Sequence, residues 1–294
     1  MLFLKLLFVF RRRNKINELN IKKSLYHYWD TSSKYYEIAE SIHEDIDDRL
    51  KELFTLVKEG SKVLDVACGS GVNRKNLPKN VFYCGIDLSF AGLSHAKRLG
   101  TDNSFIKADA ERLPLTNGSF DYIISTNAVE HFINPKLIFD EMWRVCKEGG
   151  CILLIFPNFG DYIFNYPPSI AHAMSKMPYK TMYIFRQFYR QTMRIFFKRI
   201  LFFAKIDVAP GVLLNPYSPD NDVMYLASGR EITNYFEMRG ASVTVMSKNK
   251  LSFAAPFLRN FPRNIFRFYK IVNPYYEWHG DSILVIRKQG IGLF

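Results

Sequence analysis

A run of small and acidic residues in the first third of the chain has the composition of a ligand-binding turn. Val63–Gly71 is an apolar strand that contains Asp65 and leads into Gly69-x-Gly71. Glycine lets a ligand approach the backbone because it has no Cβ, and the segment that follows offers free N–H groups. A dinucleotide site would carry a third glycine where Arg74 stands, and Asp65 would repel a pyrophosphate. The run therefore favours a ligand that carries a cationic amino group.

Two further acidic residues follow the next two predicted strands. Asp87 ends a strand within Gly85–Ser89, and Asp109 follows the strand 104–107. Because the carboxyl ends of parallel strands share one edge of a sheet, we expect all three acids to face one crevice. There Asp87 can accept hydrogen bonds from both ribose hydroxyls of an adenosine, and Asp109 can accept one from a purine amine. Each acid alone is more typical of a turn or a helix cap, so their joint spacing carries the prediction.

The elements that must position these side chains alternate between strand and helix. The apolar runs are 62–66, 81–86, 104–107, 122–125 and 152–156, with helices near 72–77, 90–99 and 135–147. Later come strands at 242–246 and 283–286 and helices at 231–239 and 256–271. Continuous apolar strands that alternate with helices are typical of a parallel sheet covered on both faces. We therefore predict an α/β fold: a doubly wound, Rossmann-like, seven-stranded, mostly parallel sheet, with N-terminal helices and a helical insertion after the fifth strand.

The stretch from about 60 to 157 resembles the S-adenosylmethionine (SAM)-binding core of class I methyltransferases, in particular the group of quinone, sterol and small-molecule methyltransferases. Six segments carry the resemblance: Val63–Gly71, Gly85–Ser89, Phe105–Leu115, Ser119–Ile124, Ala128–Phe132 and Arg144–Gly150. The family often has glycine where Ala67 stands, a small change.

The resemblance implies that SAM is the cofactor, and it assigns the binding residues by position. They are Asp65, Ala67, Gly69 and Gly71 around the methionine part, Asp87 and Leu88 at the ribose, Asp109 and Ala110 at the adenine, and Asn127 nearby. Glu130 and His131 are the predicted catalytic residues, because they stand where the family places the end of the fourth strand, beside the methyl group. We expect His131 to be a base or to orient the acceptor; the alternative is that it packs locally.

The predicted organisation has four parts: an N-terminal tail and helices (1–59), the SAM-binding core (60–157), a helical basic and aromatic insertion (158–228) and the C-terminal part of the core (229–294). The apolar run 1–10 is shorter than the roughly 20 residues of a bilayer span, and its positive charges follow it, unlike those of a secretory signal. It is either a weak interfacial anchor or a tail. The four cysteines fit no metal pattern, so we expect reduced thiols in a cytosolic protein and no metal.

The charge of the chain is concentrated in the presumed acceptor-binding part. The net charge is +12, and residues 159–206 contain thirteen Phe or Tyr and eight Lys or Arg against one acid. Basic residues recur there as Arg186, Arg190, Arg194 and Lys198, and again as Arg259, Arg263 and Arg267. Three interpretations remain open: a lid whose aromatic face packs on the core, an element that contacts a membrane surface, or a nucleic-acid-binding element.

These features predict an enzyme, a SAM-dependent methyltransferase that methylates an oxygen of a lipid, glycolipid, lipid-linked sugar or other small molecule. The alternatives are an RNA methyltransferase and a non-catalytic binding protein that keeps the fold. The expected partner is a small-molecule, lipid or glycan acceptor, with peripheral membrane contact, and nucleic acid is less favoured. We expect the chain in the cytoplasm, associated with the inner face of the membrane.

Overall fold

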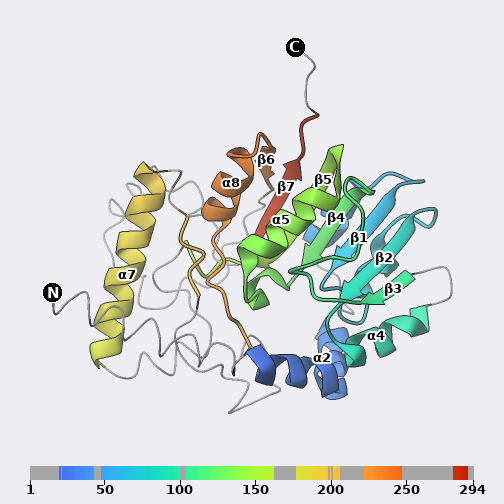
Figure 1. The fold of residues 1–294 in the computed structure, drawn as a ribbon, viewed down its shortest axis with the longest axis horizontal. Coiled ribbons are helices and arrows are strands. Elements are labelled where there is room, and N and C mark those ends of the chain that lie inside the picture. The colour runs from blue at the N-terminus through green and yellow to red at the C-terminus, as the bar shows by residue number, and fades with distance from the viewer. Residues whose placement is uncertain are drawn as a thin grey trace.

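A single seven-stranded sheet organises the part of the chain that the computed structural model describes, namely residues 20, 22–42, 48–99, 104–161, 177–197, 199, 201–205, 222–246 and 281–290. The strands are β1 (Lys62–Val66), β2 (Phe82–Asp87), β3 (Ser104–Lys107), β4 (Phe120–Thr126), β5 (Cys146–Pro157), β6 (Ser242–Val245) and β7 (Asp281–Arg287). Their order is β3-β2-β1-β4-β5-β7-β6 (Figure 1). The first five run parallel, and β7 is antiparallel to both β5 and β6. The predicted fold class is confirmed.

Helices occupy most of the segments predicted to be helical. They are α2 (Ser33–Ile42), α3 (Asp48–Phe54), η1 (Val72–Asn76), α4 (Phe90–Ala96), η2 (Lys97–Leu99), η3 (Val129–His131), α5 (Pro135–Val145), α7 (Met177–Phe196) and α8 (Gly229–Glu237), and residues 22–31 are also helical. The segment after the glycine turn is a short 3₁₀ helix. α4 begins at Ser89, whose side chain accepts a hydrogen bond from Gly92 N. The helix predicted over 256–271 lies outside the described residues.

Alternation along β1 divides the core between the two faces of the sheet. Leu64 is fully buried in one cluster with Phe139 of α5 and Phe236 of α8. Val63 is equally buried in the other cluster, with Leu53 of α3. Successive strand residues point to opposite faces, so a strand that is apolar throughout needs helices on both sides. This packing holds the carboxyl ends of β1 and β2 rigidly at one edge of the sheet.

The predicted insertion is only partly separate from this core. Tyr225 and Ala227, near its end, are fully buried in the same cluster as Leu64. Arg194, one of the recurring basic residues of the insertion, is 1% exposed and paired with Glu231. Lys198 and the second group of arginines, 259–267, lie outside the described residues.

Two expectations about the chain as a whole can be compared with the described residues. All four cysteines are buried and none forms a disulfide. In the described part, no helix has the length and apolar character needed to cross a bilayer. The N-terminal run 1–13, predicted to be an anchor or a tail, lies outside it.

Candidate cofactor and acceptor site

The turn after β1 folds back sharply because several of its residues adopt left-handed backbone conformations. Ala67 has φ 58°, Gly69 has φ 52° and Gly71 has φ 72°. Only glycine adopts this region readily, which explains two of the three residue types. Gly69 N donates to Asp87 Oδ2 at 2.7 Å, so the turn is tied to the end of β2. The predicted glycine motif is thus a rigid turn between two parallel strands.

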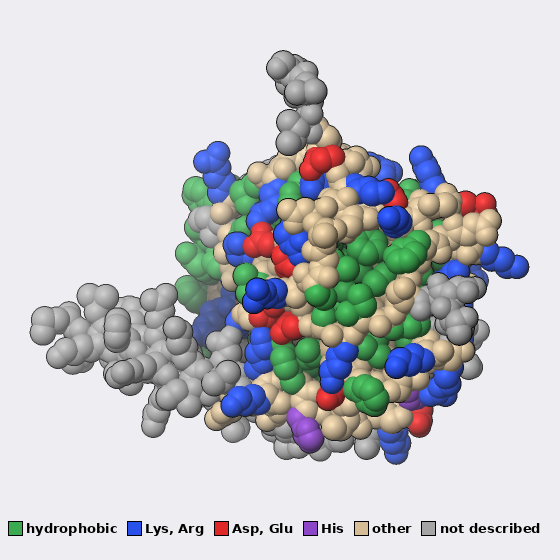
Figure 2. Space-filling model, turned by 45° about the vertical axis from the view of Figure 1, so that its right-hand side comes forward, with side chains coloured by type: hydrophobic (Ala, Val, Ile, Leu, Met, Phe, Trp, Pro, Cys, Tyr) green, Lys and Arg blue, Asp and Glu red, His purple; other side chains and the backbone are tan. Residues whose placement is uncertain are grey.

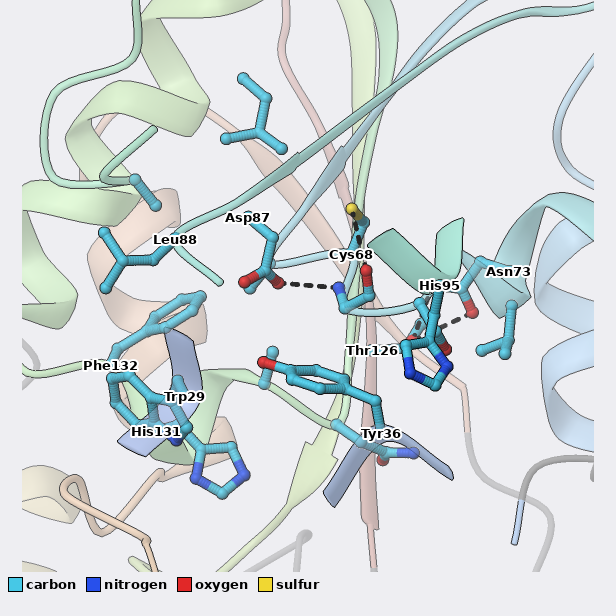
Figure 3. Close-up of a pocket in the computed structure, with 18 of the residues that line it drawn as sticks. Trp29, Tyr36, Cys68, Asn73, Asp87, Leu88, His95, Thr126, His131 and Phe132 are labelled. Carbon is cyan, nitrogen blue, oxygen red and sulfur yellow. Dashed lines mark hydrogen bonds between the residues drawn. The ribbon is translucent and has the colours of Figure 1, made fainter. Parts of the chain in front are cut away.

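A cavity of about 600 Å³ opens at this edge of the sheet, within the range of ligand pockets. Of the eleven predicted site residues, eight line it: Ala67, Gly69, Asp87, Leu88, Asp109, Ala110, Asn127 and His131. The other three, Asp65, Gly71 and Glu130, are not in its lining. Figure 3 shows Asp87 and Leu88 on one side and Asn73 and Thr126 on the other, with the ring of Tyr36 between them.

Asp65 lies behind the cavity wall and is fully buried. Its Oδ2 accepts hydrogen bonds from Tyr83 OH at 2.7 Å and from Asn73 Nδ2 at 3.0 Å, whereas Oδ1 has no partner among the described residues. Burial raises the pKa of the carboxyl to about 7, although both hydrogen bonds oppose the shift. Buried acceptors are normally satisfied, so Oδ1 is an exception, and a cationic amino group bound in the cavity would stabilise this carboxylate across the cavity wall.

Asp87 is held by backbone donors in a way that leaves acceptor capacity. Its Oδ2 accepts from Gly69 N and its Oδ1 from Ser89 N, both at 2.7 Å. Each carboxylate oxygen has a second acceptor site, so two ribose hydroxyls can still donate to it. Burial raises the pKa of this carboxyl, and the backbone bonds work against that shift. The geometry therefore fits the predicted ribose contact.

Asp109 is already engaged by the N-terminal helical segment. Tyr26 OH donates to its Oδ2 at 2.7 Å, and Lys22 Nζ lies 3.8 Å from the same oxygen. Glu111 N donates to Oδ1 at 2.9 Å. Burial, followed by the bond to Asp109, raises the pKa of the Tyr26 phenol. An adenine amine at Asp109 would therefore share this carboxylate with Tyr26.

The N-terminal helices form a wall of the cavity that the motifs did not predict. Tyr26, Trp29, Tyr35 and Tyr36 all line it. The segment is fixed to the sheet edge where β2 leads into α4 (Figure 1), since Asp30 accepts from Phe90 N at 2.7 Å. The only signal in the sequence was the density of aromatic residues in 26–36.

His131 stands at the cavity wall between two carboxylates. Its Nδ1 lies 3.4 Å from Asp222 Oδ1, and its Nε2 lies 3.6 Å from Glu130 Oε1. Asp222 lines the cavity and also accepts from Trp29 Nε1 at 2.7 Å. Sequence reasoning missed Asp222, because nothing local marks an acid that meets its partners only in the fold. In the described part of the chain, no group of three or more potential ligand side chains could hold a metal ion.

Comparison with known proteins agrees with this geometry. Residues 64–154 match the family model described as Methyltransferase domain. A demethylmenaquinone methyltransferase of Renibacterium salmoninarum is 31% identical over 136 residues, which are 42% of this chain and 57% of that protein. A malonyl-[acyl-carrier protein] O-methyltransferase of Hamiltonella defensa is 32% identical over 119 residues, 40% of this chain and 46% of that protein. The chain thus spans about half the length of these curated relatives.

A solved structure extends the comparison to the fold. A chain from the complex that contains the Haloferax volcanii Trm112 methyltransferase activator has a TM-score of 0.54 at 18% identity, and the match covers 91% of this chain and 99% of that one. A mostly parallel sheet with a cavity at its carboxyl edge is typical of Rossmann-like folds, which bind ligands at that edge. Together with the sequence matches, it places residues 64–154 in the class I SAM-dependent methyltransferase family. SAM is the cofactor of that family.

Proposed function

We propose that the chain is an enzyme that transfers a methyl group from SAM to an oxygen of a lipid, glycolipid, lipid-linked sugar or related small molecule. The observation that carries the proposal is the gathering of eight predicted site residues around one cavity. Two relatives, named for demethylmenaquinone and for a malonyl-acyl-carrier protein, motivate the choice of acceptor. We place the protein in the cytoplasm, in peripheral contact with the membrane.

The residues of the chain would hold SAM and exclude water from it. SAM supplies a methyl group that its sulfonium already activates, so direct displacement needs mainly alignment in a dry site. Asp87 would hold the ribose, and the turn at Ala67–Gly69 the methionine part. The aromatic side chains of Trp29, Tyr36 and Phe132 line the same cavity and would keep water from the reacting atoms.

His131 would take the proton of the acceptor hydroxyl. Each ring nitrogen of His131 lies beside a carboxylate, Nδ1 at 3.4 Å from Asp222 and Nε2 at 3.6 Å from Glu130. In the tautomer with the proton on Nδ1, the side of the nearer carboxylate, Nε2 would be the basic nitrogen. As the hydroxyl attacks, Nε2 accepts its proton, and Asp222 and Glu130 stabilise the imidazolium that forms. Asp222 thus acts through His131 as a positioning residue, and it links the base to Trp29 of the N-terminal segment.

The proposal is tested by SAM binding and by methyl transfer. Calorimetry should show SAM binding to the wild-type chain, and Asp87→Ala should weaken it about 100-fold, since two charge-assisted hydrogen bonds are lost. Labelled methyl should enter a lipid extract with the wild type and not with Asp87→Ala. Glu148→Ala, at an exposed carboxylate that is not in the cavity lining, is the control. A wild-type chain that does not bind SAM would refute the function.

A further inference from the structure

Helix α7 (Met177–Phe196) turns a polar side toward the protein. Gln187, Gln191 and Arg194 are 0%, 6% and 1% exposed. Gln191 donates to a backbone carbonyl at 2.9 Å, and Arg194 donates to Gly160 O at 2.8 Å and to Glu231 Oε2 at 3.1 Å. These bonds fix the rotation of the helix about its own axis.

The outer side of α7 is aromatic as a consequence. Six large apolar side chains on and just after the helix are exposed: Met182 (41%), Phe185 (71%), Phe188 (57%), Tyr189 (51%), Phe196 (73%) and Phe197 (54%). They are six of the ten exposed large hydrophobic residues in the described part of the chain, so they form a patch and are not scattered. A helix in a soluble protein normally buries this side. The lid interpretation required the aromatic side to pack on the core, and α7 has the opposite orientation.

The charge of the same helix restricts what can cover that patch. α7 contains no acid and four Lys or Arg, of which Arg194 is buried and paired with Glu231, whereas Lys180 and Arg186 are exposed. A second copy of this helix would bring like charges together, which opposes self-association. An anionic lipid surface suits both the aromatic patch and the positive charge of α7. The aromatic rings can insert at the boundary between headgroups and acyl chains, and the cations can pair with lipid phosphates.

We propose that the outer side of α7, formed by Met182, Phe185, Phe188, Tyr189, Phe196 and Phe197, docks on an anionic lipid bilayer. The inference deepens the proposed function and rests on it for the lipid-type acceptor, but docking itself needs no SAM. A nucleic-acid surface on α7 is disfavoured because the patch is mainly phenylalanine. Figure 2 turns the other end of the sheet forward, and on that face the described Lys and Arg side chains are dispersed.

Vesicle sedimentation without SAM tests the proposal. Wild-type protein should bind vesicles of phosphatidylglycerol and phosphatidylcholine in equal parts, and bind pure phosphatidylcholine more weakly. The double variant Phe185→Ser, Phe188→Ser should bind at least about tenfold more weakly, because it lacks two aromatic rings that move from water into the bilayer on binding. Leu137→Ser on α5, a residue 48% exposed, is the matched control and should bind like the wild type. Circular dichroism verifies that all variants are folded.

A charge variant separates the lipid surface from other partners. Arg186→Glu, at an exposed residue next to Phe185, should reduce binding to the anionic vesicles about fivefold and leave binding to pure phosphatidylcholine unchanged. The proposal is overturned if the wild type does not bind anionic vesicles, or if the double variant binds them as tightly as Leu137→Ser does. It is also overturned if the double variant instead abolishes a wild-type dimer or RNA binding. Loss of SAM binding alone would refute the proposed function and leave the docking result intact.

Discussion

The carboxyl of Asp65 offers a direct test of the site because it is buried without a full set of partners. Asp65→Asn keeps the size of the side chain and removes its titration. Asp65 is fully buried, and its pKa of about 7 compares with 3.8 for a free carboxyl. We expect the variant to change how the free energy of unfolding depends on pH, with the sign set by this raised pKa.

The magnitude follows from linkage between protonation and folding. Between pH 4 and pH 7 the folded state keeps the Asp65 proton that the unfolded chain loses. Stability therefore falls as pH rises through this window, by about 4 kcal/mol in all and by roughly 3 kcal/mol between pH 5 and pH 8. Above pH 7 the contribution is constant, because both states are then ionised. Asp65→Asn should lack this slope.

Urea unfolding at pH 5 and pH 8 measures the effect. The stability of Asp65→Asn relative to the wild type should rise by roughly 3 kcal/mol between the two pH values. Asp121 is the control, because Lys147 at 2.6 Å and a backbone N–H lower its pKa, so it stays ionised throughout this range. Asp121→Asn should therefore differ from the wild type equally at both pH values. A constant difference for Asp65→Asn would show that the reasoning is wrong.

The same carboxyl reports on the proposed position of SAM. A cationic amino group beside Asp65 favours the ionised form, so SAM binding near pH 6 should release a proton. Calorimetry in buffers with different ionisation enthalpies measures the number of protons released on SAM binding. Asp65→Asn should release none, and proton release unchanged in this variant would place the amino group elsewhere.

Two more substitutions test the residues that only the fold brings together. Asp222→Asn should lower kcat about tenfold with little change in SAM affinity, because His131 loses the carboxylate beside its Nδ1. An unchanged kcat would exclude the positioning role. Arg194→Met leaves Glu231 buried without its cation and should cost about 3–5 kcal/mol of stability, measured by urea unfolding. The exposed control Lys180→Ala should stay within about 0.5 kcal/mol of wild type, and a loss below about 1 kcal/mol for Arg194→Met would contradict an essential buried pair.

Much of the fold could be predicted because its signals are local. A few neighbouring residues are enough to predict the apolar strand β1, the turn at Gly69 and Gly71, and the acid that ends β2. Parallel strands then bring their carboxyl ends together whatever the details of packing, so Asp87 and Asp109 could be assigned to one crevice. The strand lengths were less predictable: β5 begins at Cys146, directly after α5, where the apolar pattern indicated a later start.

By itself the sequence determined the sheet, the glycine turn and the acids at the strand ends, since these depend on backbone conformation and on periodicity. Tertiary structure alone decided which side of α7 is buried. The sequence pattern of α7 shows that the helix has two unlike sides, but it does not show which side faces the protein. The buried pair of Arg194 with Glu231, 37 residues further along the chain, fixes the polar side inward. Tertiary structure also brought Asp222 to His131, and Trp29 to Asp222 across 193 residues. Contacts between residues so far apart produce no periodic pattern in the sequence, because each depends on packing and charge in the folded protein.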